Sequence, residues 1–166
     1  MIGSNYNVVK KRTTRAPRKN ENPNKNIEFI FACQKNEVEG CDYYYSFRNE
    51  LYGFNINDIN VILQNNLNAV IIIKAIDIIK ILKEMQKNTI SILCDPVVHA
   101  ECMEKHLEKS EDTEDNIKRR LYHYDEEKFK VEYSNNLDIF DAIVVNKYDE
   151  SFLVDFKNIL LEIGES

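Results

Sequence analysis

Three regularly spaced arginines stand near the start of the chain, in the stretch KRTTRAPRKNE. Arg12, Arg15 and Arg18 are three residues apart, with Pro17 between the last two. A guanidinium is a planar fork that grips the oxygens of a phosphate in pairs, which the ammonium of lysine does not do. Such a cluster predicts an anion site when nearby residues support it, and is otherwise ordinary solvated surface.

The composition narrows the class of protein. The chain has 166 residues, 43% of them hydrophobic and 30% charged, which is typical of one globular domain. A net charge of −6 argues against nonspecific nucleic-acid binding, and the longest apolar run, AVIII, is too short to cross a membrane. The four cysteines form no CxxC pair and no signal peptide is recognisable, so we expect a cytoplasmic protein with reduced thiols.

The hydrophobic pattern alternates between strands and helices from residue 57 onward. β-Branched and apolar runs predict strands, and apolar residues at helical spacing predict helices, with Asn57 or Asp58 as the first cap. We expect strands at 27–34, 42–47, 68–75, 89–96 and 140–147, and helices at 55–66, 76–88, 97–109, 110–133 and 149–164. This order is typical of an α/β fold with a parallel sheet flanked by helices.

Several motifs occur along the chain in the order in which one enzyme family carries them. TTRAPRKNE, EVEGCDYYY and LYG are followed by EDTEDNIKRRL and FDAIVVNKYDESFLVDFKNIL. The chain resembles guanylate kinases, P-loop enzymes that phosphorylate GMP from ATP, from about residue 8 to residue 161. The resemblance implies a single domain, 1–166, of the nucleoside monophosphate kinase type. It divides into a small mixed-β GMP-binding subdomain at 8–54, a core at 55–108 and 138–166, and a lid-like segment at 109–137.

The resemblance also implies roles for individual residues. Arg15 and Arg18 would hold the phosphate of GMP. The other residues that it places around the nucleotides are Tyr43 and Tyr52 at the same phosphate, Glu37 in the first motif, Lys109 and Arg120 in the lid, and Asn146 near adenine. Glu21 competes with Glu37 for the place of the motif's glutamate.

The departures from the family concern catalysis and base recognition. The chain contains no G-x-x-G-x-G-K-[ST] motif, whose backbone N–H groups and lysine surround the phosphates of ATP. Ile73 and Ala75 stand where the family has acidic residues in one core strand, and Phe54 stands where the family has a serine. We therefore expect binding at the former GMP site without kinase activity and without a cofactor. ATP and Mg²⁺ enter only if a P-loop lies outside this chain or comes from a partner.

Residues 22–36 look like an insertion within the first motif. Its strand either takes the place of the missing P-loop strand in the core or extends the small mixed sheet, and the second is the simpler expectation. A partner chain or a second copy of this chain completing the core sheet remains a further alternative.

Three interpretations of the arginine site stay open at this point. The arginine site suits a GMP-like nucleotide, or a phosphopeptide of the kind bound by scaffold proteins with guanylate kinase-like domains. The third alternative is an interaction protein in which the phosphate site is vestigial. His99, Cys102 and His106 share a helical face near Cys94, but their spacing is not that of a standard zinc site, so we expect no metal.

Overall fold

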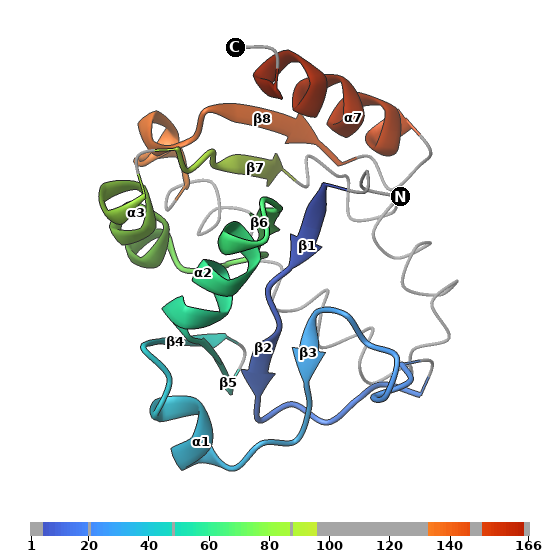
Figure 1. The fold of residues 1–166 in the computed structure, drawn as a ribbon, viewed down its shortest axis with the longest axis vertical. Coiled ribbons are helices and arrows are strands. Elements are labelled where there is room, and N and C mark those ends of the chain that lie inside the picture. The colour runs from blue at the N-terminus through green and yellow to red at the C-terminus, as the bar shows by residue number, and fades with distance from the viewer. Residues whose placement is uncertain are drawn as a thin grey trace. The chain divides into compact units, whose positions relative to one another are not determined.

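The computed structural model describes residues 5–19, 21–47, 49–86, 88–95, 133–146 and 151–164. The chain divides into two compact units, Met1–Ile78 and Ile79–Ser166, and the division falls within helix α3 (Figure 1). Each unit has its own sheets and is treated separately below. The division lies inside the segment that the sequence assigned to the core.

The first unit contains a mixed four-stranded sheet in the order β3-β2-β5-β4. Its strands are β2 (Lys11–Thr13), β3 (Phe29–Ile30), β4 (Tyr43–Phe47) and β5 (Glu50–Phe54). Strands β4 and β5 form a hairpin in which Phe47 pairs with Glu50. Asn49 adopts φ 63° in this tight turn, a left-handed conformation that asparagine tolerates better than most residues. The short turn brings the two aromatic strands into register.

The two faces of this sheet have different neighbours. Helix α1 (Lys35–Glu39) packs against β5, where Gly53 lies close to the carbonyl of Val38 and to the thiol of Cys41. Because side chains alternate along a strand, Arg12 and Tyr44, the cross-strand neighbours of Gly53, share its face. Lys11, Thr13 and the rings paired with them therefore line the opposite face, which carries the candidate site.

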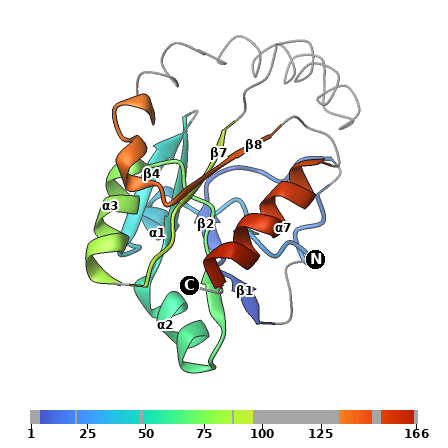
Figure 2. The same cartoon turned by 90° about the horizontal axis from the view of Figure 1, so that it is seen from above.

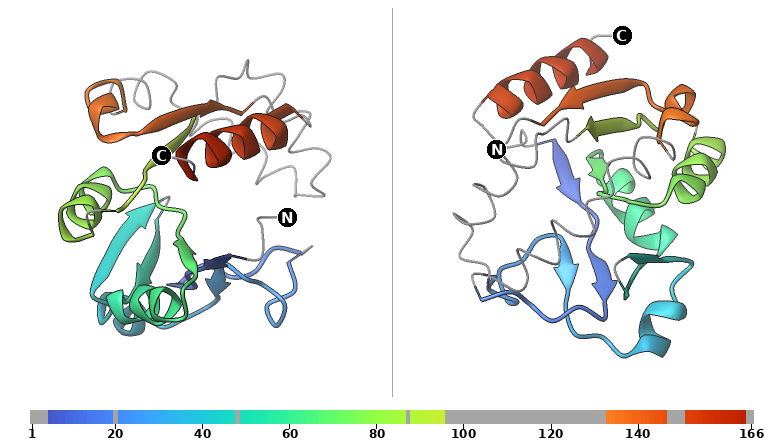
Figure 3. Two further views of the ribbon diagram at one scale, coloured as in Figure 1. Left: turned by 45° about the horizontal axis from the view of Figure 1, so that its top comes forward. Right: turned by 180° about the vertical axis from the view of Figure 1, so that it is seen from behind.

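A separate parallel pair joins β1 (Tyr6–Val8) to β6 (Asn68–Val70) in the same unit. Helix α2 (Ile56–Gln64) lies beside β6 (Figure 3). It buries Ile59 and Ile62, as its apolar spacing predicts. Its N-cap is Asn55 rather than Asn57 or Asp58, so the sequence placed the cap two or three residues too late. The next helix, α3 (Ile76–Met85), buries Ile76, Ile78 and Leu82, whereas Met85 of the predicted apolar face is half exposed.

The second unit pairs β7 (Ile92–Asp95) in parallel with β8 (Ala142–Val145). Helix α7 (Ser151–Gly164) contacts β8 and runs beside it (Figure 2). A 3-10 turn at Leu137–Ile139 precedes β8. Asp141 accepts hydrogen bonds from Lys83 at 2.8 Å and from the Ser91 N–H at 2.7 Å, which join α3, β7 and β8.

Most of the predicted elements within the described residues are confirmed, although several strands are shorter than expected. Strand 27–34 reduces to Phe29–Ile30, and the continuous parallel sheet is replaced by two separate parallel pairs among the described residues. Helix α1 and strand β5 were not predicted. Since β3 pairs with β2, the inserted segment extends the small mixed sheet, which is the simpler of the two alternatives. The helices expected at 97–109 and 110–133 lie almost wholly outside the described residues.

Candidate functional site

Arg15 and Arg18 converge on a single carboxylate, that of Glu21. Arg15 donates from Nη1 and Nη2 to the two oxygens of Glu21 at 2.8 and 3.0 Å. The backbone N–H of Arg18 donates to Glu21 Oε2 at 2.7 Å, and Arg18 Nη1 lies 3.7 Å from Oε1. Two guanidinium groups and one backbone N–H thus surround one anionic group, which is the donor set that a phosphate also requires.

The loop after β2 holds these residues in place. The Arg15 N–H donates to Thr13 Oγ1 at 3.1 Å, and the Glu21 N–H donates to the Arg18 carbonyl at 3.0 Å. Although partial burial alone would raise the pKa of Glu21, hydrogen bonds from Arg15 and Arg18 lower it below its usual range. Glu21 is therefore ionised at neutral pH and forms a charge-assisted pair.

Tyr52 belongs to the same cluster. It pairs with Thr13 across the sheet, and its ring stacks on that of Tyr45 at 5.5 Å between centroids. Burial raises the pKa of the Tyr52 phenol, while the positive charges of Arg15 and Arg18 act in the opposite direction. The hydroxyl is therefore protonated at neutral pH and lies within electrostatic reach of both arginines.

Segment 22–36 supplies one side of the site. Arg15 Cζ lies 5.2 Å from the ring centroid of Phe29 and 4.9 Å from that of Phe31. Lys11, which is 2% exposed, places its Nζ 4.8 Å from the Phe29 centroid. Burial lowers the pKa of Lys11, and an ion pair with Glu28 at 3.2 Å opposes that shift. Lys11 also donates to the backbone carbonyl of Ile72, so its ammonium is held by two acceptors.

The residues expected at the phosphate are only partly brought together. Arg15, Arg18 and Tyr52 cluster, whereas Tyr43 lies farther along the sheet, where it pairs with Phe54. Glu37 lies in the first turn of α1, where its Oε2 accepts the Gln34 N–H at 2.6 Å as part of a capping box. Between the two competing glutamates, Glu21 is the one that contacts the arginines.

Two other groups of predicted residues lie elsewhere. Asn146 follows β8 in the second unit, and its N–H donates to the Asp95 carbonyl at 2.8 Å. Lys109 and Arg120 lie outside the described residues, as do His99, Cys102 and His106. No group of three His, Cys, Asp or Glu side chains in the described part of the chain is arranged to hold a metal ion.

Sequence reasoning missed the contribution of the aromatic residues. Phe29 and Phe31 were assigned to a strand, and their contacts with Arg15 depend on the pairing of β3 with β2. The spacing of Phe29 and Phe31 gave one weak indication of this contact. Residues two apart in a strand lie on the same face, so both rings were expected on one side of it. Lys11 carried no signal beyond its charge.

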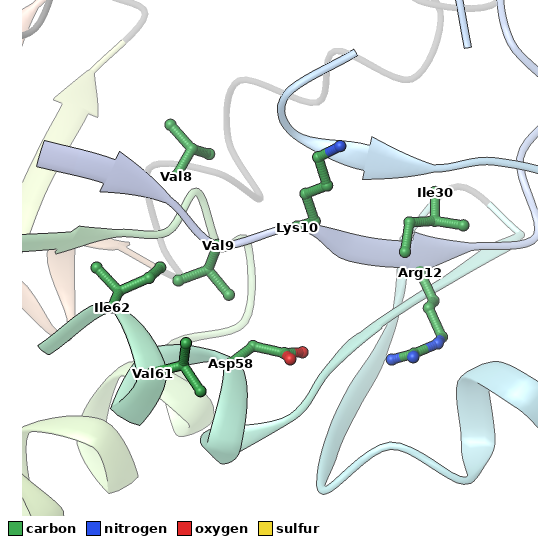
Figure 4. A pocket seen from close by; sticks show the side chains of 8 residues that line it. All are labelled: Val8, Val9, Lys10, Arg12, Ile30, Asp58, Val61 and Ile62. Carbon is green, nitrogen blue, oxygen red and sulfur yellow. The ribbon is translucent and has the colours of Figure 1, made fainter. Parts of the chain in front are cut away.

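A hollow elsewhere in the first unit has a different lining. Figure 4 shows valines from the end of β1 and from α2 around it, with Arg12 farther along β2. Its lining residues are Val8, Val9, Lys10, Arg12, Ile30, Asp58, Val61 and Ile62. Arg12, the first of the three spaced arginines, lines this hollow, but none of the residues that the resemblance places at the phosphate does. The hollow therefore lies apart from those residues.

A solved protein shares the fold of this chain. The crystal structure of guanylate kinase from Anaplasma phagocytophilum matches with a TM-score of 0.64 and 18% sequence identity, over 97% of this chain and 75% of that chain. No protein-family model and no curated protein matches the sequence. The chain therefore has a guanylate kinase-like fold, and the identity is too low to transfer a ligand or an activity. Within the described residues, no helix is long and apolar enough to span a membrane.

Proposed function

We propose that this guanylate kinase-like chain binds a nucleoside monophosphate, or another phosphate-bearing ligand, through Arg15, Arg18 and Tyr52. The observation that carries the proposal is the convergence of both arginines on the Glu21 carboxylate. A phosphate offers the same pair of oxygens to the Arg15 fork and carries more charge. The ligand phosphate takes the place of Glu21 at this fork, and the protonated Tyr52 hydroxyl is a further donor.

The chain by itself is proposed not to transfer a phosphoryl group. Phosphoryl transfer depends on positioning and on neutralising charge, chiefly by a P-loop and Mg²⁺. The sequence of this chain contains no GK[ST] motif, which supplies the P-loop lysine and hydroxyl. The proposed activity is therefore binding, without ATP or Mg²⁺ as cofactors.

Calorimetric titration with GMP, and separately with ATP and Mg²⁺, tests the proposal. We expect GMP to bind and ATP not to bind. The double variant R15A/R18A should lose GMP binding, whereas K35A/K157A, which removes two exposed positive charges elsewhere, should retain it. Unchanged binding in R15A/R18A would refute the proposed site.

Two alternative functions are each favoured by a specific observation. A quarter of the solved guanylate kinase has no counterpart in this chain, so an active GMP kinase completed by a segment or partner outside the chain is a second candidate. Binding of both GMP and ATP would favour it. The third candidate is a protein-interaction domain, since Glu21 already neutralises Arg15. Failure of both nucleotides and of phosphopeptides to bind, together with binding of an unphosphorylated protein, would favour that function.

A further inference from the structure

Arg15 is held on one side by two aromatic rings that come from a distant part of the sequence. Its Cζ lies 5.2 Å from the Phe29 centroid and 4.9 Å from the Phe31 centroid, and the two centroids are 5.6 Å apart. The guanidinium and the two rings therefore form a nearly equilateral triangle. The rings are tilted by 45° to each other, so they make a wedge against which the guanidinium rests.

Each ring of this wedge is itself fixed. Phe29 pairs with Lys11 in the sheet, lies 4.8 Å from the Lys11 ammonium, and contacts the ring of Tyr52 at 5.9 Å. Phe31 precedes Ala32, whose N–H donates to the Arg15 carbonyl at 3.0 Å. The next residue, Cys33, donates its N–H to the Thr13 carbonyl at 2.9 Å. The backbone that carries Phe31 is thus bonded to the backbone that carries Arg15.

The side chains of the two arginines differ in how exposed they are. The Arg15 side chain is 15% exposed and makes two close bonds to Glu21. The Arg18 side chain is 45% exposed, and its guanidinium lies 3.7 Å from Glu21. An arginine with fixed orientation loses less rotamer freedom when a ligand binds, and a partly desolvated charge attracts an anion more strongly. The Arg15 guanidinium is therefore already oriented and partly desolvated.

We propose that Phe29 and Phe31 are positioning residues of the anion site, which hold the Arg15 fork in the plane that receives a phosphate. This inference rests on the proposed function. The attraction between a guanidinium and the face of a ring supplies the orientation, and the apolar rings limit the access of water to that side of the cation. Segment 22–36 thereby becomes part of the binding site, although neither ring needs to touch the ligand.

Leucine substitutions test the rings while keeping apolar side chains in place. We expect F31L to weaken binding of GMP, measured by calorimetry, roughly three- to tenfold, and F29L/F31L to weaken it further. F31Y keeps the aromatic face and should bind as the natural protein does. Y44L is the matched control, because Tyr44 is 49% exposed and lies on the opposite face of the same sheet. It should leave the affinity unchanged.

A double-mutant cycle with R15K separates positioning from general stability. Lysine keeps the charge but has no fork, so F31L should cost little additional affinity in the R15K background. An equal loss in both backgrounds would overturn the inference. A second measurement, the ¹⁵N–¹H signal of Arg15 Nε, should shift in F31L as the ring current is lost, and it applies even where a double variant folds poorly.

The outcomes distinguish this inference from the proposed function. If the natural protein binds neither GMP nor inorganic phosphate, the proposed function fails and this inference fails with it. If GMP binds and requires Arg15, but F31L and F29L/F31L bind with unchanged affinity, the inference alone is overturned. The inference is also contradicted if F31Y loses as much affinity for GMP as F31L does.

Discussion

Replacing Glu21 with glutamine should tighten phosphate binding, because the carboxylate occupies the fork that the ligand needs. Glu21 makes bonds of 2.8 and 3.0 Å to Arg15, and the two side chains are 18% and 15% exposed. In E21Q the amide oxygen still accepts one hydrogen bond from the Arg15 guanidinium, but the amide NH₂ group cannot accept the second. A hydrogen bond to a charged group contributes about 1.5–3 kcal/mol, and less where the groups are partly exposed, so E21Q should weaken the internal pair by about 1–2 kcal/mol.

That difference sets the size of the effect on affinity. A ligand that must break the pair regains this free energy in E21Q, so the dissociation constant for GMP should fall roughly 5- to 30-fold. Calorimetry at pH 7.5 measures it. The control E39Q makes the same charge change in the exposed pair between Lys35 and Glu39 and should leave the affinity unchanged. Equal or weaker GMP binding by E21Q would refute the reasoning, since it would mean that Glu21 orients Arg15 for the ligand.

The same pair predicts a dependence on pH with a definite sign. The pKa of Glu21 is lowered in the folded protein, so the pair stabilises the fold above the unfolded pKa, about 4.3, and that stability is lost as the pH falls through the folded pKa. Protonated Glu21 also releases the fork. Sulfate keeps its charge in this range, so its affinity for the natural protein should rise as the pH falls towards that pKa, while E21Q should lack this rise.

Two further predictions concern stability. A Cβ at Gly53 would lie 2.8 Å from the Val38 carbonyl and 3.0 Å from Cys41 Sγ, so G53A should lower the free energy of unfolding by about 1–3 kcal/mol in urea denaturation. A milder loss is expected for G40A, whose nearest contact is 3.1 Å, and equal losses would contradict the packing argument. In the second unit, burial alone would raise the pKa of Asp141, but bonds from Lys83 and Ser91 lower it. The free energy of unfolding should therefore fall as the pH drops through that pKa. In D141N the free energy of unfolding should depend less steeply on pH in the acid range. An identical dependence on pH in D141N would exclude a contribution of Asp141 to acid sensitivity.

Local patterns were sufficient to predict the three longer helices of the described residues, although not the short helix α1. The apolar spacing of 55–66, 76–88 and 149–164 led to α2, α3 and α7, because a helix that packs on one side repeats its buried residues every three to four positions. Strand β5 was missed because its residues, Glu50–Phe54, include a glycine and follow a tight turn at which the sequence gives little warning. Its existence depends on pairing with β4 and β2, which is a nonlocal interaction.

For the candidate site as well, the sequence indicated some features and the folded structure added others. The spaced arginines indicated an anion site by their residue type, and the resemblance of TTRAPR to the family motif singled out Arg15 and Arg18. The choice between Glu21 and Glu37 was open in the sequence. In the folded loop Glu21 contacts both arginines, a contact that the sequence did not indicate.

The sequence therefore states which functional groups the chain carries, but it does not state which side chains contact one another. Guanidinium groups, a tyrosine and the absence of a GK[ST] motif are properties of the residues themselves, and they led to the proposal of phosphate binding without catalysis. The contacts of Phe29 and Phe31 with Arg15 arise only because β3 pairs with β2 and the following backbone bonds to residues 13 and 15. Side chains that are fourteen to sixteen positions apart meet through the sheet, and no local pattern records that register.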